Sequence, residues 1–301
     1  MLCGLLLLDK PVGLSSNAAL QRVRRLLGGV KAGHTGSLDP LATGMLPICV
    51  GEATKLAGEV LAGDKAYRFR LALGTRTATG DAEGEVVERC AVPALTRAGV
   101  EAVLVRRLGA SLQVPPMYSA LKHRGEPLYR VARRGESVER APRPIHLHAL
   151  ELRGFGPDWL DLYAVCSKGT YVRVLGEDIA AALGSCGHLE ALRREYVEPF
   201  RDQPMLTLEQ LAARIGEGGW LLPPDAAVPQ YPVVPLDAGA AAALQHGRTL
   251  TTPVSGNPGT VRLHDAAGRF FGLGVRDASG RLRPRRLFAL PAPQSDRAPR
   301  T

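Results

Sequence analysis

Cysteine is scarce in this sequence, and the few cysteines are not spaced for cross-linking or for metal binding. There are five in 301 residues, an odd number, widely scattered and without a C-x-x-C pair: Cys3, Cys49, Cys90, Cys166 and Cys186. This spacing supports neither a zinc site nor a disulfide framework. We therefore expect reduced, mostly buried thiols and a reducing compartment.

The sequence also lacks a hydrophobic run long enough to cross a membrane, which needs about 20 apolar residues. The longest early run, Leu5–Leu8, has no basic residue before it and is followed at once by Asp9-Lys10-Pro11. It is too short for the core of a signal peptide. We predict a buried strand there, no contact with a membrane and a cytoplasmic location.

Motifs for nucleotide cofactors and for serine hydrolases are missing as well. No G-x-x-x-x-G-K-[ST], G-x-G-x-x-G or G-x-S-x-G occurs, and the glycine spacing around Gly51–Lys55 is wrong for a P-loop. His146 and His148 could project to one face of a strand, but no third metal ligand is in view. We expect no cofactor and no metal.

Positive charge, by contrast, is in excess. Lys and Arg total 38 against 29 Asp and Glu, which gives a net charge of +9 and a pI of about 9.6. Such a surplus favours an anionic partner such as nucleic acid, because each cation that neutralises a phosphate releases a counterion. A charge that serves only solubility is the alternative that composition leaves open.

The hydrophobic pattern predicts a mixture of strands and helices without strict βαβ alternation, which favours an α+β fold. We expect strands at residues 4–9, 67–73, 145–152 and 160–166. Helices are predicted after a cap at Ser15, Ser16 or Asn17, at 95–108, after a strand end within 171–183, at 189–194 and at 207–215. Residues 113–129 should form an irregular surface loop.

The last quarter of the chain predicts a separate small module. Residues 221–235 are rich in proline and make the best linker. Short strand signals follow at Val261–Leu263, Phe270–Val275 and Leu287–Leu290, which indicates a β-rich module. We place the domains at 1–228 and 229–292, with a disordered tail at 293–301.

The segment 33–47 contains three glycines, and Asp39 precedes Pro40 within it. Taken alone, Asp39-Pro40 could be a simple turn. However, Pro40 disfavours the α conformation at Asp39, and flanking glycines let the backbone approach a ligand closely. A carboxylate held in such a loop can attack an electrophilic carbon.

Segments along nearly the whole chain, in the same order, resemble the bacterial tRNA pseudouridine-55 synthases, the TruB family. Besides residues 33–55, the matching motifs are Asp9–Ser16, Lys65-Ala66-Tyr67, Pro116–Lys122, Cys166–Arg173 and Pro284–Leu287. The resemblance implies a central mixed, largely antiparallel sheet flanked by helices and loops, with a C-terminal β-rich PUA-like RNA-binding domain. It also implies isomerisation of uridine to pseudouridine at position 55 in the T-loop of tRNA, without a cofactor.

This resemblance assigns the chemistry to three residues. Asp39 matches the essential nucleophile, which attacks either C6 of the base or C1′ of the sugar. Arg173 would pair with Asp39 and keep the carboxylate ionised and aimed. Tyr67 would stack on the flipped uracil and assist proton transfer. For each of the last two, a purely structural role is the alternative.

Further residues in the matching motifs are expected to bind the substrate: His34, Gly36, Tyr171, Leu192, Lys10 and Lys168. Leu192 would line the base pocket, although a plain core leucine fits nearly as well. His34 would contact the space that the extruded base leaves. Glu195 and Glu198 depart from the family pattern after Arg194 and put contacts with RNA there in doubt.

The expected partner is tRNA, bound at its T-loop and T-stem, with the C-terminal module reaching the acceptor end. Phosphate contacts are predicted from clusters of arginines: Arg22, Arg24 and Arg25; Arg130, Arg133 and Arg134; Arg140 and Arg143; Arg281, Arg283, Arg285 and Arg286. A monomer is expected. The competing hypothesis is an RNA-binding or RNA-folding protein without catalysis on the same scaffold.

Overall fold

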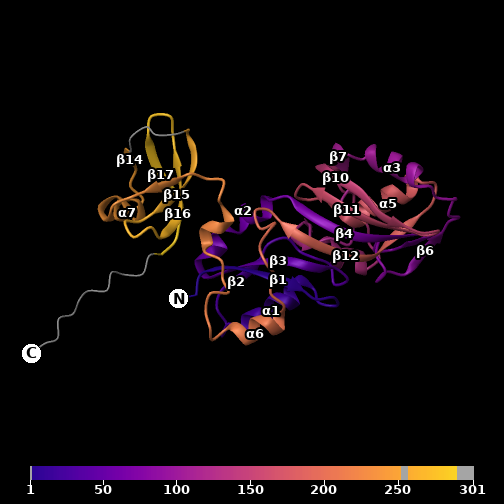
Figure 1. Cartoon of the computed structure of the whole chain (residues 1–301), viewed down its shortest axis with the longest axis horizontal. Coiled ribbons are helices and arrows are strands. Elements are labelled where there is room, and N and C mark those ends of the chain that lie inside the picture. Colours follow the sequence, from indigo (N-terminus) through magenta and orange to yellow (C-terminus); the bar gives the residue numbers. More distant parts are fainter. Residues whose placement is uncertain (1, 252–256, 290–301) are drawn as a thin grey trace, which may run out of the picture.

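A large mixed sheet forms the body of the computed structural model, which describes residues 2–251 and 257–289 (Figure 1). Seven strands follow in the order β1-β3-β12-β4-β11-β10-β7, and β2 pairs with β3 as the eighth. All these pairings are antiparallel except that of β12 with β3. The strands are β1 (Gly4–Lys10), β2 (Ala32–His34), β3 (Thr43–Val50), β4 (Lys65–Leu73), β7 (Gly109–Gln113), β10 (Arg143–Phe155), β11 (Trp159–Cys166) and β12 (Gly187–Val197). The predicted α+β class is confirmed.

Helices cover this sheet because each buries an apolar face against it. The largest core joins side chains of β1, β3 and β4 to helices on one face, with Val23, Val100 and Ile179 each fully buried. These helices are α1 (Ser16–Leu26), α3 (Arg97–Val105), α5 (Val172–Ala182) and α6 (Leu208–Arg214). The opposite side chains of β1, such as Leu5 and Leu7, enter a second core with η1 (Gly51–Leu56), α2 (Ala57–Ala62) and η2 (Pro224–Ala227).

The C-terminal part forms a five-stranded sheet in the order β13-β15-β16-β17-β14, at the opposite end of the long axis from α3 and β7 (Figure 1). Its elements are β13 (Val233–Pro235), α7 (Ala238–Gln245), β14 (Leu250–Thr251), β15 (Gly259–His264), β16 (Phe270–Arg276) and β17 (Arg281–Leu287). Leu273 and Phe288 enter the second core of the large sheet. The Lys55 ammonium donates to the Leu287 carbonyl (2.7 Å).

The proline-rich stretch 221–235 is paired with other elements rather than free: Leu222 pairs with β1 of the large sheet, and Val233–Pro235 form β13 of the C-terminal sheet. Leu222 and Leu5 exchange backbone hydrogen bonds of 2.9 Å, and Ala227 and Val228 are buried. Each proline removes a backbone donor here, but the backbone still pairs where it retains N–H groups. The domain boundary at 228 and 229 stays a prediction, and the tail predicted at 293–301 lies outside the described residues.

Most predicted elements exist close to their expected positions. β1, β4, β10 and β11 confirm the four strands of the first part, and α3 and α6 confirm two helices. The Ser15 side chain caps α1 by accepting a hydrogen bond from the Ala18 amide (3.1 Å). The last strand, however, is β17 rather than Leu287–Leu290. Its alternating burial places Arg281, Arg283 and Arg285 on the exposed face.

The helix predicted at 189–194 is wrong, since these residues belong to strand β12. β4 pairs with β12 from Gly187 to Val197, and β3 pairs with it at Arg193 and Arg194, so ladder hydrogen bonds hold these residues in a strand. Such pairing overrides local helix propensity. Within 33–47 only residues 35–42 are loop, because the segment begins at the end of β2 and ends in β3. Within 113–129, β8 (Lys122–His123) pairs with β9 (Glu126–Pro127), and α4 (Leu128–Arg133) follows.

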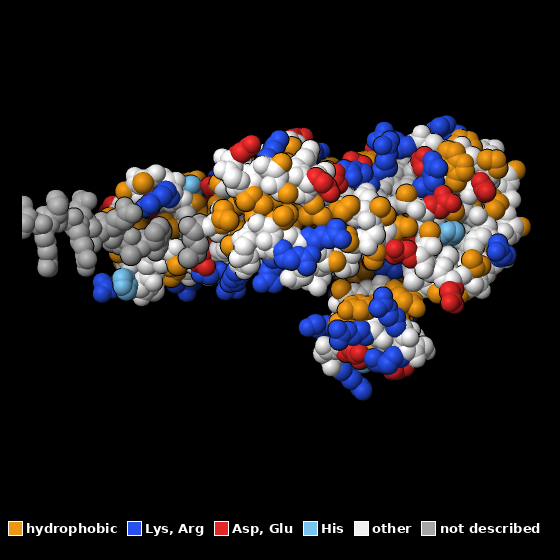
Figure 2. Space-filling view, turned by 90° about the horizontal axis from the view of Figure 1, so that it is seen from below, with side chains coloured by type: hydrophobic (Ala, Val, Ile, Leu, Met, Phe, Trp, Pro, Cys, Tyr) orange, Lys and Arg blue, Asp and Glu red, His pale blue; other side chains and the backbone are white. Residues whose placement is uncertain are grey.

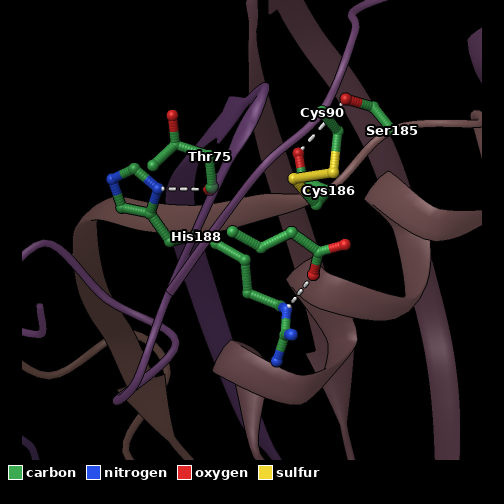
Figure 3. Close-up of a disulfide and its surroundings, with 7 residues drawn as sticks. Thr75, Cys90, Ser185, Cys186 and His188 are labelled. Carbon is green, nitrogen blue, oxygen red and sulfur yellow. Dashed lines mark hydrogen bonds and ion pairs between the residues drawn. A yellow bond between two sulfur atoms is a disulfide. The ribbon is translucent and has the colours of Figure 1, made fainter. Parts of the chain in front are cut away.

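The expectation that all cysteines are reduced is wrong for two of them. Cys90 and Cys186 form a disulfide with a Cα–Cα distance of 5.7 Å across 96 residues of sequence (Figure 3). Cys90 follows the hairpin of β5 (Thr75–Thr77) and β6 (Val86–Arg89), which lies beside the start of β12. No local spacing signals such a pair, since only folding of the hairpin onto the sheet brings the thiols together. Cys3, Cys49 and Cys166 are free.

Among the described residues, no helix is long and apolar enough to span a membrane. His146 and His148 do share one face of β10, with ring centroids 4.6 Å apart. His148 pairs with Asp64 (3.0 Å). In residues 2–251 and 257–289, no group of three His, Cys, Asp or Glu side chains could hold a metal ion.

Candidate active site

The loop 35–42 presents Asp39 between β2 and β3, and hydrogen bonds from neighbouring elements fix its shape. The Ser16 hydroxyl accepts from the Leu38 amide (2.7 Å) and donates to the Leu38 carbonyl (3.0 Å). The Gly13 amide donates to the Pro40 carbonyl (2.8 Å). The Asp39 side chain remains 39% exposed. A rigid loop thus holds a carboxylate that a ligand can still reach.

Arg173, in the first turn of α5, lies against this carboxylate. Its Nε is 2.9 Å from Oδ2 of Asp39, and Nη2 donates to Oδ1 over 3.4 Å. The guanidinium also donates to the carbonyls of Thr79 and Tyr118, each over 2.6 Å. The Arg173 side chain is only 5% exposed, so the surrounding residues hold it in one position. The predicted pair of Asp39 and Arg173 is therefore present.

Two opposing effects act on the ionisation of Asp39. Burial raises the pKa of this carboxyl above its ordinary value, because a charge is poorly solvated there. The Arg173 guanidinium opposes that rise, whereas the nearby Asp81 carboxylate adds to it. Asp81 is itself buried and lies 3.8 Å from Nε of Arg173. Arg173 therefore limits a rise in the pKa rather than holding it below the usual range.

Tyr67 lies in the middle of the sheet, on β4 between β12 and β11. Burial raises the pKa of its phenol, and the charge of the Arg194 guanidinium opposes this rise. The charge of Asp39 also acts on this phenol, which indicates that the two groups are near one another. The hydroxyl is thus held neutral as a hydrogen-bonding group at neutral pH.

The backbone of Tyr171, just before α5, is held by a single buried side chain. Gln113, at the end of β7, accepts from the Tyr171 amide (2.8 Å) and donates to its carbonyl (3.1 Å). Burial raises the pKa of the Tyr171 phenol. Gln113 therefore sets where α5, and with it Arg173, begins.

Lys10, a predicted substrate contact, is fully buried at the end of β1. Its ammonium donates to the carbonyls of Pro11 (2.9 Å), Leu14 (2.6 Å) and Pro40 (3.3 Å). Burial lowers its pKa to about 8. These bonds tie the turn after β1 to the loop of Asp39, which gives Lys10 a structural function in the free protein. A contact with substrate stays a prediction.

The other predicted contacts occupy varied positions. His34 ends β2, and its buried Nδ1 has no hydrogen-bond partner among the described residues. Gly36 has a φ of 73°, and its carbonyl accepts from Arg194 (2.9 Å). Leu192 is 8% exposed and lies opposite Phe69 in the sheet, whereas Lys168 is exposed. The Asp39 carboxylate thus interacts electrostatically with four of the predicted residues: Arg173, Tyr67, Tyr171 and Lys10.

Sequence reasoning missed three residues of this region: Asp81, Gln113 and Arg194. Asp81 lies in a glycine-rich hairpin, a signal like the one that singled out Asp39. Arg194 belongs to the run Leu192-Arg193-Arg194, in which only Leu192 was predicted to contact the substrate. Gln113 carries no signal of its own, because only the fold brings it to Tyr171.

Lys and Arg side chains are scattered over the face seen in Figure 2, and they gather on a small lobe that projects from the body. Of the predicted arginine clusters, residues 281, 283, 285 and 286 are all exposed on β17. Some cations are engaged locally: Arg134 pairs with Glu126 (2.6 Å), and Arg285 pairs with Glu59 (3.0 Å). Arg281, Arg283 and Arg286 form no ion pair with the described residues.

Comparisons with known proteins identify the family of this chain. Residues 24–172 match the N-terminal domain model of the TruB family of pseudouridylate synthases, and residues 173–219 and 232–288 match two C-terminal domain models of that family. The chain belongs to the TruB family. A tRNA pseudouridine synthase B of Stutzerimonas stutzeri is 49% identical over 95% of each chain. That of Coxiella burnetii is 45% identical over 95% of this TruB-family chain and 94% of the relative.

Solved structures share the fold at lower identity. A chain from a Cbf5–Nop10–Gar1 complex superposes with a TM-score of 0.70 at 23% identity, over 92% of this chain and 79% of the other. A chain from an H/ACA ribonucleoprotein bound to a substrate RNA gives 0.72 at 21%, over 95% and 85%. These likenesses confirm the predicted pseudouridine synthase fold.

Proposed function

We propose that this TruB-family chain isomerises the uridine at position 55 in the T-loop of tRNA, with Asp39 as the nucleophile. The observation that carries this proposal is the pair of Asp39 and Arg173, in which a reachable carboxylate lies 2.9 Å from a buried guanidinium. The family match and relatives that bear the name tRNA pseudouridine synthase B support the reaction.

The residues divide the chemistry among them. The Asp39 carboxylate attacks the target nucleotide, at C6 of the base or C1′ of the sugar. Arg173 keeps that carboxylate oriented, and Tyr67 stacks on the extruded uracil and assists proton transfer. The N1–C1′ glycosidic bond breaks, the ring turns, and a bond forms from C5 to C1′. The bond between Asp39 and the nucleotide then breaks and regenerates the carboxylate, while the C5 proton leaves and N1 takes up a proton. Atoms balance without an oxidant or reductant.

The positive surface suits the rest of the substrate. Exposed arginines would contact phosphates of the T-stem, and the β17 arginines would contact the acceptor end. His34, Gly36, Tyr171, Leu192, Lys10 and Lys168 are proposed to bind or shape the pocket around the base. We propose a monomer that acts in the cytoplasm, where tRNA is modified.

Tritium release from tRNA labelled at C5 of uridine tests this proposal. We expect the native chain to release tritium, with pseudouridine mapped to position 55 alone. Asp39→Asn should release none while still binding tRNA. Asp161→Asn is the matched control, because Asp161 also pairs with an arginine, Arg70, at 2.8 Å. A native chain that binds tRNA without releasing tritium would support the non-catalytic alternative instead.

A further inference from the structure

Arg194 is a buried cation for which the mechanism above has no use. Its side chain is among the largest that are fully buried, at 1% exposure. No ion pair joins it to a carboxylate within residues 2–251 and 257–289. Burying an unpaired charge is costly, so the contacts that such a group makes deserve a specific explanation.

The contacts of Arg194 reach strand β3 and the loop of Asp39. Nε donates to the Met45 carbonyl on β3 (2.6 Å), and Nη2 donates to the Gly36 carbonyl in the loop of Asp39 (2.9 Å). Nη1 also lies beside this loop, since a Cβ at Gly36 would be 3.4 Å from it. The guanidinium fork therefore fixes the loop three residues before the nucleophile.

Strand pairing places Arg194 directly across from Tyr67. The two residues are opposite partners in the antiparallel ladder of β12 and β4, where Cβ atoms are about 5 Å apart. On the other side, Arg194 pairs with Gly44 of β3, whose missing side chain allows the strands to approach. The charge of the guanidinium also opposes the rise that burial causes in the pKa of the Tyr67 phenol.

Other cations nearby make the charge of Arg194 more unusual. Lys65 is buried two residues before Tyr67, and its ammonium donates to the carbonyls of Leu61 (2.8 Å) and Gly63. Burial, and then the charge of Arg194, lowers the pKa of Lys65 to about 8. Placing the charge of Arg194 beside that of Lys65 does not stabilise the fold. This favours a function that depends on where the Arg194 guanidinium is held.

We propose that Arg194 is a positioning residue for the isomerisation, which fixes the Tyr67 hydroxyl and the Asp39 loop relative to each other. This inference rests on the proposed function. The loop carries the nucleophile, and Tyr67 contacts the base, so a displacement between them separates the reacting atoms. Displacements of about 1 Å can cost about 100-fold in rate.

Two substitutions separate the effect of the guanidinium geometry of Arg194 from the effect of its positive charge. Arg194→Lys keeps the positive charge, but its single ammonium cannot hold Met45, Gly36 and Tyr67 together. Arg194→Met removes both the charge and these contacts. Arg193→Lys is the control, because Arg193 is the next residue on β12 and is 36% exposed in an ion pair with Asp9 (2.9 Å). Single-turnover tritium release and tRNA affinity are measured for each protein.

We expect Arg194→Lys to slow single turnover by about 100-fold while the Kd for tRNA changes less than about threefold. Arg193→Lys should stay within about twofold of the native rate. If the methionine variant does not fold, the lysine variant carries the test alone. The proposal would be overturned if Arg194→Lys kept the single-turnover rate of the native chain, or if it weakened only the affinity for tRNA.

A second measurement needs no activity. The titration of Tyr67 is read from tyrosinate absorbance, as the difference between each protein and its Tyr67→Phe partner. Loss of the positive charge in Arg194→Met should move this titration to higher pH, whereas Arg194→Lys should move it less. An unchanged titration in Arg194→Met would refute the contact with Tyr67. If the native chain released no tritium, the proposed function would fail, and this titration would still decide the contact.

Discussion

Asp39 and Arg173 lie 134 residues apart in sequence, yet Nε of Arg173 is 2.9 Å from Oδ2 of Asp39. The arginine is 5% exposed and the aspartate 39%, so the buried partner has the fixed position and the exposed one can meet a ligand. The carbonyls of Thr79 and Tyr118 hold the guanidinium from other sides. Four separate segments thus meet at one ion pair.

Activity should fall in acid at a higher pH than an ordinary aspartate would give. Only the ionised carboxylate can attack, so activity is present above the pKa of Asp39 and lost as pH falls through it. Burial raises this pKa, and the loss therefore begins above the usual range for aspartate. Single-turnover tritium release across pH measures it. An acid limb at the ordinary aspartate pKa would contradict the raised value.

Arg173→Met should move that acid limb to still higher pH, because the guanidinium is what opposes the effect of burial on Asp39. The maximal rate should also fall, by about 100-fold, since the carboxylate loses its orientation. Arg70→Met is the control, because it removes another arginine that pairs with an aspartate, Asp161. An unshifted acid limb in Arg173→Met would show that the guanidinium does not act on the nucleophile.

Gln113→Leu should destabilise the protein by about 1–3 kcal/mol, because the backbone N–H and C=O of Tyr171 lose their partners. The start of α5 should loosen with it, and single turnover should slow by about tenfold. Urea unfolding and tritium release measure the two effects. Leu112→Ala, at a neighbouring residue whose side chain is 71% exposed, should change neither. Native stability in Gln113→Leu would rule out the anchoring.

Breaking the disulfide should lower the free energy of unfolding by about 2–4 kcal/mol, since the bond closes a loop between residues 96 apart in sequence. Cys90→Ser and Cys186→Ser should each have this effect, whereas Cys3→Ser, at a free thiol, should not. Dithiothreitol should lower the urea midpoint of the native chain but not that of the double variant. Equal midpoints with and without reductant would show that the bond contributes nothing.

Local pattern alone predicted much of the scaffold. The apolar run at Leu5–Leu8, the alternation through Tyr67–Leu73 and the cap at Ser15 each predict an element that the structure contains. These predictions are correct because the local sequence determines such elements through propensity, periodicity and capping. Asp39 and Arg173 were found in the same way, from short motifs that resemble a family.

Long-range pairing decided the rest. Residues 189–194 form a strand because β4 offers ladder partners along them and β3 adds partners at Arg193 and Arg194, although their sequence favours a helix. Cys90 meets Cys186, and Gln113 meets Tyr171, only because the sheet brings together distant segments. The sequence by itself thus determined most of the elements and singled out Asp39 as the proposed nucleophile. Tertiary structure decided which groups surround that nucleophile, because burial and charge depend on neighbours in space.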